Sequence, residues 1–353
     1  MRLLIWQWGR RGAGPRYAAE LATTLRDDPA TTPILSLSRQ SELVEAGLAV
    51  PDLPVDTYAG VAGWAARMAS IPAAAFPLAR QLRRLRLDAA FCAMPGPLDL
   101  LMVAALRLAH VRFAAAVHDA ELHPGDILPW QMLLQRALLR QASALVTFSP
   151  SVAATLAVQG RVRGRPVLST TLSPFGFGPR PSPPRSHGGP FRLLCFGRLL
   201  PYKGLDLLAD ALEWLGPNAD LSVRVVGSGP ESPDLDRLRQ VGLVENRWVP
   251  EGEVGSLLAW ADGVVLPYRE ASQSGVAAAA VEAGRFVVAT RVGGLPDQLR
   301  DAPGLVLCAP ESTDLARAIG EVLLAPMPET REVGRDWHRK AADLASWISV
   351  ALH

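Results

Sequence analysis

Lysine is almost absent from this chain of 353 residues, which contains 34 Arg but only two Lys, Lys203 and Lys340. Where Arg occupies nearly every basic position, a Lys at 203 suggests a site that uses a compact ammonium group. Cysteine is also scarce, and each of the three lies in an apolar run without forming a CxxC pair: Cys92, Cys195 and Cys308. This pattern argues against zinc or redox chemistry and predicts reduced core thiols in a cytoplasmic protein.

A long uninterrupted hydrophobic run is missing as well. The most apolar region, residues 98–117, is broken by Arg107, His110 and Arg112, so it does not predict a membrane span. The first residues, MRLLIWQWGRR, are typical of a short strand and a loop, and we expect no cleavable signal. With 49% hydrophobic and 20% charged residues, the chain suits a well-packed protein that is long enough for two domains.

Acidic residues are outnumbered in the first half of the chain only. Residues 1–180 contain 19 Arg against 12 acidic residues, a net charge of +7. Residues 181–353 contain 17 basic against 22 acidic residues, a net charge of −5. This asymmetry predicts that the first half faces an anionic partner.

Strand-like and helical runs alternate along the chain, which predicts an α/β protein with parallel sheets. In the first half the predicted strands are Arg2–Trp8, Pro33–Ser38, Val55–Tyr58, Asp88–Met94, Arg112–His118, Ala144–Ser149 and Pro166–Thr171. In the second half they are Phe191–Gly197, Leu221–Val226, Arg247–Val249, Gly263–Leu266, Phe286–Thr290 and Gly304–Cys308. Between the halves, residues 179–190 (PRPSPPRSHGGP) contain five prolines and no apolar period, which predicts a linker.

Residues 59–88 depart from this regularity, because apolar and aromatic residues are followed by a group of arginines: Arg80, Arg83, Arg84 and Arg86. One interpretation is a surface that lies against anionic lipid headgroups. The other is a core helix with a solvated basic face.

The most informative stretch is residues 268–296, YREASQSGVAAAAVEAGRFVVATRVGGLP. A polar loop at 271–275 opens directly into an Ala-rich helix, so unpaired backbone N–H groups and the positive end of the helix dipole predict an anion site. Glu282 is the only acid between Glu270 and Asp297. It is either a solvated surface residue or a ligand to a polar group.

Two segments before this stretch contain cations and glycines at strand ends. In FGRLLPYKGLD (196–206), Arg198 and Lys203 flank a predicted strand-to-helix turn, where two cations can meet a diphosphate. Ordinary surface cations are the alternative. In VVGSGPE (225–231), Gly227 and Gly229 permit a tight turn after a buried strand. The segment lacks a full GxGxxG pattern before a helix, which argues against a nicotinamide enzyme.

Together with VATRVGGLPD (288–297), these segments resemble the donor domain of a glycosyltransferase of the GT-B fold, close to the retaining family 4, also called glycosyl transferases group 1. The family's G-R-x4-K-G, V-x-G-x-G-P and V-x-A-T-x-x-G-G-x-P-E segments match in this order, with Asp297 in place of the last Glu. The resemblance implies an α/β GT-B fold with two Rossmann-like doubly wound domains facing a cleft. Residues 1–178 would form the N-terminal acceptor-side domain and residues 191–331 the donor domain, with helices of residues 332–353 packing back on the first.

The family's signature is a pair of glutamates separated by seven residues, and here the first of them is replaced by Ser274 while Glu282 takes the place of the second. The resemblance implies that Glu282 binds the two ribose hydroxyls of the donor. It implies that the diphosphate or donor sugar lies against Gly197, Gly227, Gly229, Ser274, Gly275 and Val276, with Arg198 and Lys203 stabilising the leaving group. Gln273 could supply part of the sugar contact that the missing Glu leaves open.

In the first half, the loop before residue 16 and the end of a predicted strand provide further candidates. Gly12 and Gly14 would permit close approach of the donor phosphate, and Arg16 could meet an acceptor phosphate, although a plain structural turn explains the glycines equally well. His118 and Asp119 follow an apolar strand at the edge where doubly wound sheets bind ligands, so we expect His118 to act in catalysis and Asp119 in acceptor binding. His118, Glu121, His123 and Asp126 could also suggest a metal site, but the family resemblance implies no metal or other cofactor.

The predicted function is transfer of a sugar from a UDP- or GDP-sugar to an acceptor hydroxyl with retention of configuration, which the resemblance alone implies. The basic first half favours a lipid-linked saccharide of bacterial polysaccharide assembly as acceptor, and hence a cytoplasmic protein peripheral on the inner membrane face. A soluble metabolite acceptor and a non-catalytic GT-B nucleotide-binding subunit are the alternatives. We expect no nucleic-acid partner.

Overall fold

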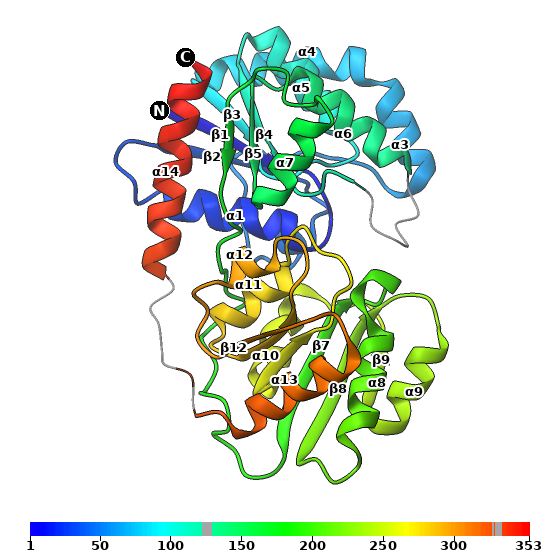
Figure 1. The fold of residues 1–353 in the computed structure, drawn as a ribbon. Coiled ribbons are helices and arrows are strands. Elements are labelled where there is room, and N and C mark those ends of the chain that lie inside the picture. Colours follow the sequence, from blue (N-terminus) through cyan, green and yellow to red (C-terminus); the bar gives the residue numbers. More distant parts are fainter. Residues whose placement is uncertain (122–128, 327, 329–333) are drawn as a thin grey trace. The chain divides into compact units, whose positions relative to one another are not determined.

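A computed structural model of the chain describes residues 1–121, 129–326, 328 and 334–353. The chain divides into two compact units (Figure 1). The first contains the chain up to Thr170 together with Gly334–His353, and the second begins at Thr171. This division falls earlier than residue 178, where the sequence predicts the end of the first domain.

The first unit is built on a sheet of six parallel strands in the order β2-β1-β3-β4-β5-β6. The central strands consist of buried residues, and β4 has the sequence FAAAV. Such uninterrupted apolar strands are typical of a parallel sheet covered on both faces. The strands are β1 (Arg2–Gln7), β2 (Thr32–Leu37), β3 (Ala89–Cys92), β4 (Phe113–Val117), β5 (Ala144–Thr147) and β6 (Val167–Ser169).

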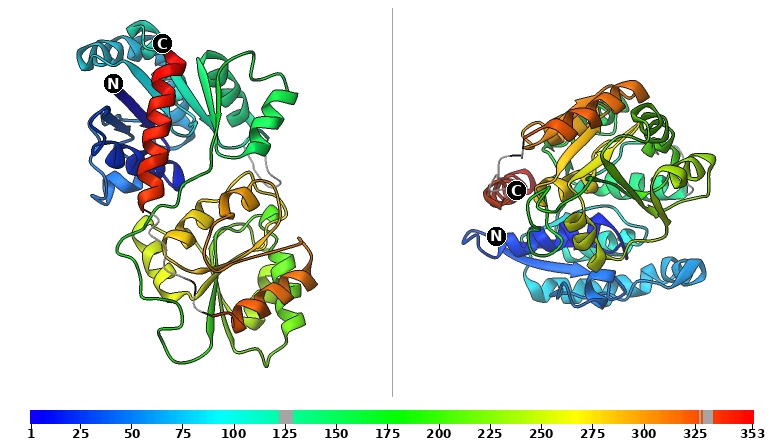
Figure 2. Two further views of the ribbon diagram at one scale, coloured as in Figure 1. Left: turned by 60° about the vertical axis from the view of Figure 1, so that its left-hand side comes forward. Right: turned by 90° about the horizontal axis from the view of Figure 1, so that it is seen from below.

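Helices join these strands and cover the sheet (Figures 1 and 2). They are α1 (Ala13–Leu25), α2 (Glu42–Glu45), α3 (Gly60–Ala69), α4 (Ile71–Leu85), α5 (Asp99–Ala109), α6 (Pro129–Gln141) and α7 (Pro150–Val158). The C-terminal helix α14 (Gly334–Leu352) also belongs to this unit and packs on α1. The rings of Tyr17 and Trp337 join these two helices at a centroid distance of 5.7 Å.

The second unit repeats the plan with a parallel sheet in the order β12-β11-β10-β7-β8-β9. Alternate residues of β7 point into two separate cores, since Leu193 belongs to one hydrophobic cluster and Leu194 to the other. The strands are β7 (Phe191–Arg198), β8 (Leu221–Ser228), β9 (Leu243–Asn246), β10 (Gly263–Leu266), β11 (Phe286–Thr290) and β12 (Leu305–Cys308). The helices are η1 (Pro201–Lys203), α8 (Leu205–Leu215), α9 (Pro233–Val241), α10 (Glu251–Trp260), α11 (Gly275–Glu282), α12 (Leu295–Leu299) and α13 (Ser312–Leu324).

The predicted fold class, α/β with two doubly wound parallel sheets, is confirmed. Two predicted strands were wrong. Residues 55–58 form only an isolated bridge from Val55 to Ser38, and β9 precedes the predicted Arg247–Val249. The Arg247 side chain instead pairs with Glu245 and Glu253, which suits a polar loop better than a buried strand.

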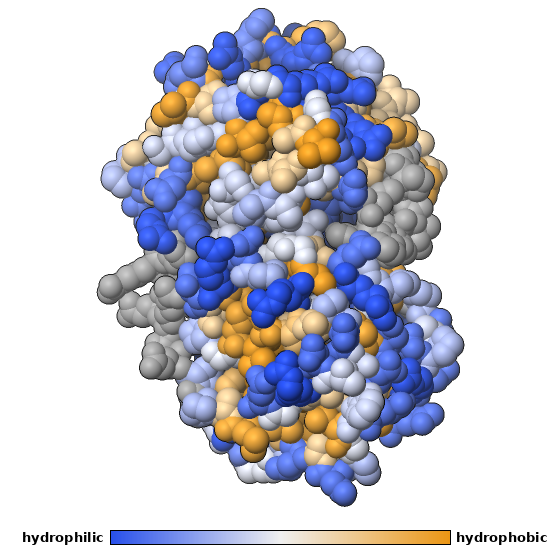
Figure 3. All heavy atoms as spheres, in the orientation of Figure 1, coloured by the Kyte–Doolittle hydropathy of each residue, from blue (hydrophilic) through white to orange (hydrophobic). Residues whose placement is uncertain are grey.

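All three cysteines are buried and unpaired. Within the described residues, no helix is both long and apolar enough to span a bilayer. The face drawn in Figure 3 is mixed, with hydrophilic side chains surrounding smaller hydrophobic areas in both units.

Candidate active site

The order of strands in the second unit marks the position of a ligand site. Strand β7 lies between β8 and β10, and the chain winds outward in opposite directions from the β7/β10 pair. In doubly wound sheets, ligands bind outside the carboxyl ends of the strands at this switch point. The segments that follow β7 and β10 contain Arg198 and Lys203, and the loop up to Ser274, respectively.

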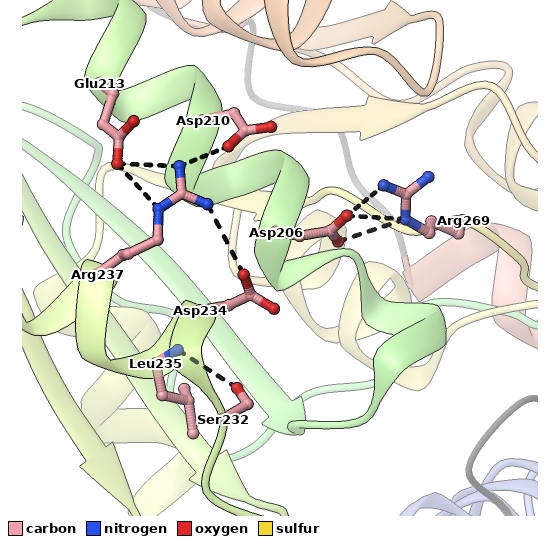
Figure 4. A network of polar contacts seen from close by, with 8 residues as sticks. All are labelled: Asp206, Asp210, Glu213, Ser232, Asp234, Leu235, Arg237 and Arg269. Atoms are coloured by element: carbon pink, nitrogen blue, oxygen red, sulfur yellow. Dashed lines mark hydrogen bonds and ion pairs between the residues drawn. The ribbon is translucent and has the colours of Figure 1, made fainter.

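The turn after β7 is held rigidly against the end of β10. Gly204 has a φ of 66°, and a Cβ there would lie 1.8 Å from the carbonyl oxygen of Pro267, so no larger residue fits. The backbone N–H of Arg269 donates to the carbonyl of Tyr202 at 2.8 Å. Its guanidinium also pairs with Asp206 at the start of α8, as Figure 4 shows.

Arg269 therefore clamps the turn that carries Lys203. Although burial raises the pKa of Asp206, the hydrogen bonds and charge of Arg269 outweigh burial and hold that pKa below its ordinary value. Figure 4 also shows a neighbouring network in which Arg237 of α9 reaches Asp210 and Glu213 of α8. These pairs are partly exposed, so they orient the two helices more than they stabilise the unit.

Two tyrosines hold the cations of the turn. Arg198 donates to the hydroxyl of Tyr202 at 2.6 Å. The Lys203 ammonium lies 3.6 Å from the ring centroid of Tyr268, a close cation–π contact. The Tyr268 hydroxyl in turn lies 3.2 Å from the Ser274 hydroxyl. The cations after β7 and the start of α11 thus belong to one contact network.

The N-terminus of α11 packs over the end of β7, since the Val276 side chain would lie 3.3 Å from a Cβ at Gly197. Ser274 is 3% exposed, and its hydroxyl caps the helix by accepting from the Ala277 N–H at 3.2 Å. Gln298 fixes the Ser274 backbone with two hydrogen bonds of 2.8 Å. The Ser274 hydroxyl therefore has a structural task, whereas the first N–H groups of α11, including those of Gly275 and Val276, lack intrahelical acceptors by helix geometry.

Gln273, one residue before the cap, is the unusual polar residue of this loop. Its side chain is only 6% exposed. Neither its amide nitrogen nor its amide oxygen has a hydrogen-bond partner within the described part of the chain. Because an unpaired buried amide is costly, the Gln273 side chain requires a partner such as a water molecule or a ligand.

Glu282 is the last residue of α11, two helical turns beyond Ser274. It is half-buried and lines a small recess of about 40 Å³ together with residues 176–181, of which 179–181 belong to the predicted linker. With a rise of 1.5 Å per residue, eight residues separate the two positions by about 12 Å along the helix.

Gly227 and Gly229 have a packing role. A Cβ at Gly227 would lie 1.7 Å from the carbonyl oxygen of Gly197, and one at Gly229 would lie 2.0 Å from that of Leu199. Both glycines let β8 and its following turn approach the backbone after β7. They shape the candidate site by bringing these turns together, whatever else they contact.

In the first unit the switch point lies between β1 and β3. A recess of about 160 Å³ opens there, lined by Gln7, Gly9, Pro95, Gly96, Pro97 and Gln135. Gln135 also donates to the carbonyl of Asp119 at 2.9 Å, which places the His118–Asp119 pair beside the recess. His118 Nδ1 lies 3.0 Å from the Asp119 carboxylate. If Nδ1 carries the proton, Nε2 is left as an acceptor, as a general base requires.

Asp99, for which the sequence predicts no role, lies under this recess. It is 1% exposed and accepts hydrogen bonds from the Gly96 N–H at 2.6 Å and the Trp6 indole at 3.3 Å. Burial raises the pKa of Asp99 to about 7, against the effect of these donors and of the Cys92 thiol, which lower it. The only hint in the sequence is a single acid at the start of an apolar helix.

Of the other predicted residues of the first unit, Gly14 and Arg16 have close partners and Gly12 does not. Gly12 precedes α1 with a φ of 85° and open space around it, whereas a Cβ at Gly14 would lie 2.8 Å from the Gln7 side chain. Arg16 is half-buried and pairs with Glu20 at 2.9 Å. Its guanidinium is therefore already engaged before any acceptor phosphate arrives.

The candidate metal residues His123 and Asp126 lie outside the described residues. Among the residues that the structure does describe, no group of three or more His, Cys, Asp and Glu side chains is arranged to hold a metal ion.

Comparisons with known proteins agree on one family. The family described as "Glycosyltransferase Family 4" matches residues 14–167, and that described as "Glycosyl transferases group 1" matches residues 190–324. A D-inositol 3-phosphate glycosyltransferase of Actinosynnema mirum is 34% identical over 37% of this chain and 35% of its own length. A GDP-mannose-dependent alpha-(1-6)-phosphatidylinositol monomannoside mannosyltransferase of Mycolicibacterium smegmatis is 30% identical over 46% of this chain and 44% of its own length. The chain thus matches less than half the length of each of these relatives.

Solved structures extend the likeness of the fold to the whole chain. A glycosyltransferase of Rickettsia africae has a TM-score of 0.65 at 15% identity, covering 99% of this chain and 93% of that one. HepE of Anabaena, solved in complex with UDP and glucose, has a TM-score of 0.65 at 17% identity, covering 100% and 95%. Two doubly wound sheets of this kind and the two matching family segments lead to one assignment: the chain belongs to the GT-B glycosyltransferases of family 4, the glycosyl transferases group 1.

Proposed function

We propose that this protein transfers a sugar from a nucleotide diphosphate sugar to an acceptor hydroxyl. The observation that carries the proposal is the cluster at the β7/β10 switch point, where Arg198, Lys203 and the N-terminus of α11 belong to one contact network. Two cations beside unpaired backbone N–H groups suit a diphosphate, the leaving group of such a transfer. A donor with a uridine or guanosine base is proposed, because HepE was solved with UDP and the mycobacterial relative is named for GDP-mannose.

In the proposed reaction the acceptor oxygen forms a bond to the anomeric carbon as the bond from that carbon to the diphosphate oxygen breaks. The electron pair goes to the diphosphate, whose growing charge Arg198, Lys203 and the α11 amides stabilise. The acceptor proton passes to a donor phosphate oxygen or to His118, which Asp119 orients. Front-face attack would retain the anomeric configuration. The proposed reaction uses no metal, since these groups supply the positive charge.

Lys203→Ala tests the role of the turn, with Lys340→Ala as the matched control because these are the only two lysines. Loss of one donor aimed at developing charge costs about 2.7–4 kcal/mol, so release of UDP or GDP should fall by a factor of about 100 to 1,000. A panel of UDP- and GDP-sugars with simple acceptors provides the assay, and thermal unfolding checks that the variant is folded. Near-normal transfer by Lys203→Ala would rule out the diphosphate assignment.

Glu282 is proposed as the ligand of the ribose diol. Isothermal titration calorimetry with UDP and GDP should show weaker binding for Glu282→Ala than for the parent protein. Glu270→Ala is a suitable comparison, because Glu270 is an exposed acid of the same segment. Equal affinity of the parent and the Glu282 variant would contradict the ribose role.

The stereochemical outcome needs a separate measurement. The product's anomeric proton coupling in NMR decides between retention and inversion.

A lipid-linked saccharide is the proposed acceptor, and a membrane surface the proposed place of reaction. The name of the mycobacterial relative specifies a phosphatidylinositol monomannoside, and that of a Xanthomonas campestris relative, 30% identical over 42% of this chain and 46% of its own length, a glycolipid. The chain's own contribution is α4, whose outward face presents Phe76, Arg80 and Arg84. Incubation with lipid-linked and soluble saccharides in parallel separates this acceptor from a soluble metabolite.

A nucleotide-binding subunit without catalysis is the second candidate, because Ser274 replaces the expected carboxylate and its hydroxyl caps α11. The donor panel separates the two functions. Such a subunit would bind UDP or GDP in calorimetry but release no nucleotide from any sugar donor.

A further inference from the structure

A basic recess lies in the first unit, between the C-terminal half of α6 and the turn that joins α7 to β6. Its volume is about 410 Å³. It is lined by Arg136, Leu139, Arg140, Gln159, Gly160, Arg161, Arg163 and Arg165. Five of these eight residues are arginines, and none of them belongs to the site proposed for sugar transfer.

Among the residues that the structure describes, little negative charge lies close to this recess. The sequence contains no Asp or Glu between Asp126 and Asp206. Arg136, Arg140 and Arg163 are exposed, and within the described residues their side chains form no ion pair or hydrogen bond. Glu121 is the acid that acts on this group: it attracts Arg161 and accepts a hydrogen bond from Gln159 at 2.7 Å.

The two deeper arginines are fixed by main-chain carbonyls. Arg165 donates to the carbonyls of Leu139 and Arg161, and to that of Ala142 at 3.1 Å. Arg161 donates to the carbonyl of Ala120 at 2.8 Å. Arg165 thus satisfies carbonyl groups at the C-terminal end of α6. The same contacts hold the guanidinium groups of Arg161 and Arg165 in place before any ligand binds.

The positive charges of these arginines repel one another in the free protein. Burial lowers the pKa of Arg161, and the neighbouring Arg136 lowers it further. Burial and the neighbouring Arg163 have the same effect on the pKa of Arg165. Arg163 has a φ of 54°, an unfavourable backbone conformation for a residue with a side chain. Like charges held together in a concave surface focus a positive potential, which a bound anion relieves.

We propose that this recess is a second anion site, which binds a phosphate or diphosphate group. Guanidinium groups match the oxygens of phosphate with paired hydrogen bonds, and the recess presents several of them from two directions. Leu133, 62% exposed, precedes Arg136 by one helical turn, and Val158, 89% exposed, directly precedes Gln159. A lipid headgroup and a free diphosphate share the required chemistry, and exposed apolar side chains next to lining residues in the sequence favour the lipid. The site does not depend on the proposed sugar transfer.

The test is a triple variant, Arg136→Gln/Arg140→Gln/Arg163→Gln, which leaves the anchored Arg161 and Arg165 in place. Arg198→Gln and Lys203→Gln are introduced into both the triple variant and the parent protein with which it is compared. The proposed donor site then does not contribute to anion binding in either protein. Calorimetry with inorganic pyrophosphate should show binding that is at least tenfold weaker in the triple variant. Flotation with phosphatidylcholine vesicles, with and without phosphatidic acid, should show a matching loss if the phosphate belongs to a lipid.

The control removes the same charge elsewhere. Arg239→Gln/Arg300→Gln/Arg317→Gln changes three exposed arginines of the second unit, each already paired with an acid on its own helix or next to it. Pyrophosphate affinity of this control should stay within twofold of the parent. Loss confined to vesicles identifies a lipid phosphate, and loss confined to pyrophosphate a soluble one. Equal binding by parent and triple variant in both assays, or equal loss in the control, would overturn the proposal.

Discussion

At the scale of single residues, the proposal that the buried amide of Gln273 contacts the transferred sugar can be tested directly. Replacing it with Met, which has a similar shape but no amide, should raise the stability of the ligand-free protein by about 1 kcal/mol, because an unpaired buried amide is removed. The same change should lower transfer about tenfold, because a sugar hydroxyl loses its partner. Thermal unfolding and kcat/KM over the donor panel measure the two effects.

Gln240→Met, at an exposed position of α9, is the control for Gln273. It should change neither quantity. A Gln273→Met protein that transfers every sugar as well as the parent would remove Gln273 from the donor site. A uniform loss of both stability and transfer would instead show that the amide has an internal partner.

Asp99 makes the stability of the first unit depend on pH. Its carboxyl has an ordinary pKa of 3.8 and a folded pKa of about 7, so the folded state favours the protonated form. The stability from this group is fully present below pH 4, is lost as pH rises to 7 and is constant above that. The loss can reach about 4 kcal/mol, since each unit of difference corresponds to 1.36 kcal/mol.

Asp99→Asn should flatten this dependence, because the amide does not titrate. Its amide has one acceptor oxygen for the Gly96 and Trp6 donors, so the variant should also be less stable at every pH. Urea unfolding between pH 4 and 8, followed by tryptophan fluorescence, measures both effects. A parent protein with equal stability at pH 4.5 and pH 7.5, and a variant with the same profile, would contradict the assignment.

At the scale of elements, replacing glycine with alanine should have opposite effects on stability at positions with and without room for a side chain. Gly229→Ala should destabilise the second unit by about 1–3 kcal/mol, because the new Cβ would overlap the Leu199 carbonyl after β7. Gly320→Ala, inside α13 with no atom near the new Cβ, should stabilise it by about 0.5–1 kcal/mol. Urea unfolding of the two variants compares them. Stabilisation by Gly229→Ala would show that the turn after β8 is not closely packed.

The elements were largely predictable because their signals are local. Apolar runs such as Phe286–Thr290 and Gly263–Leu266 match strands of the structure. The alternation of strands and helices was enough to predict two doubly wound sheets. The prediction of a strand at Val55–Tyr58 was wrong. The β-branched and aromatic residues there indicate a strand, but they do not show whether a neighbouring strand is free to pair with it.

The candidate site was only partly predictable, because its supports are far apart in the sequence. The cations at 198 and 203 stand in a recognisable segment, but Arg269, which clamps their turn through Asp206, has no local pattern. Whether Gln273 is buried without a partner, and whether the Ser274 hydroxyl is used up as a cap, depend on packing of α11 against β7 and Gln298. Asp99 was missed for the same reason.

At the scale of the whole molecule, the uneven charge of the chain bears on whether the protein acts at an anionic membrane surface. The α4 helix buries Ala75, Leu78, Ala79 and Leu82, so the core-helix interpretation holds for that face. Its opposite face remains available to anionic lipid, since Phe76 is 61% exposed and Arg80 and Arg84 follow at successive turns. Phe76→Ser/Arg80→Gln/Arg84→Gln should therefore weaken association with vesicles that contain phosphatidylglycerol by at least tenfold, since each basic residue near such a surface contributes about 1 kcal/mol.

The matched control for α4 is Trp214→Ser/Arg239→Gln/Arg317→Gln, which removes an exposed aromatic residue and two arginines from the second unit. This control should float with the vesicles as the parent protein does. Raising the salt concentration should release the parent, because exposed charges are screened within about 10 Å at 0.1 M salt. Flotation of the α4 variant at the parent's level would mean that this face is only solvated, and the acceptor should then be sought among soluble saccharides.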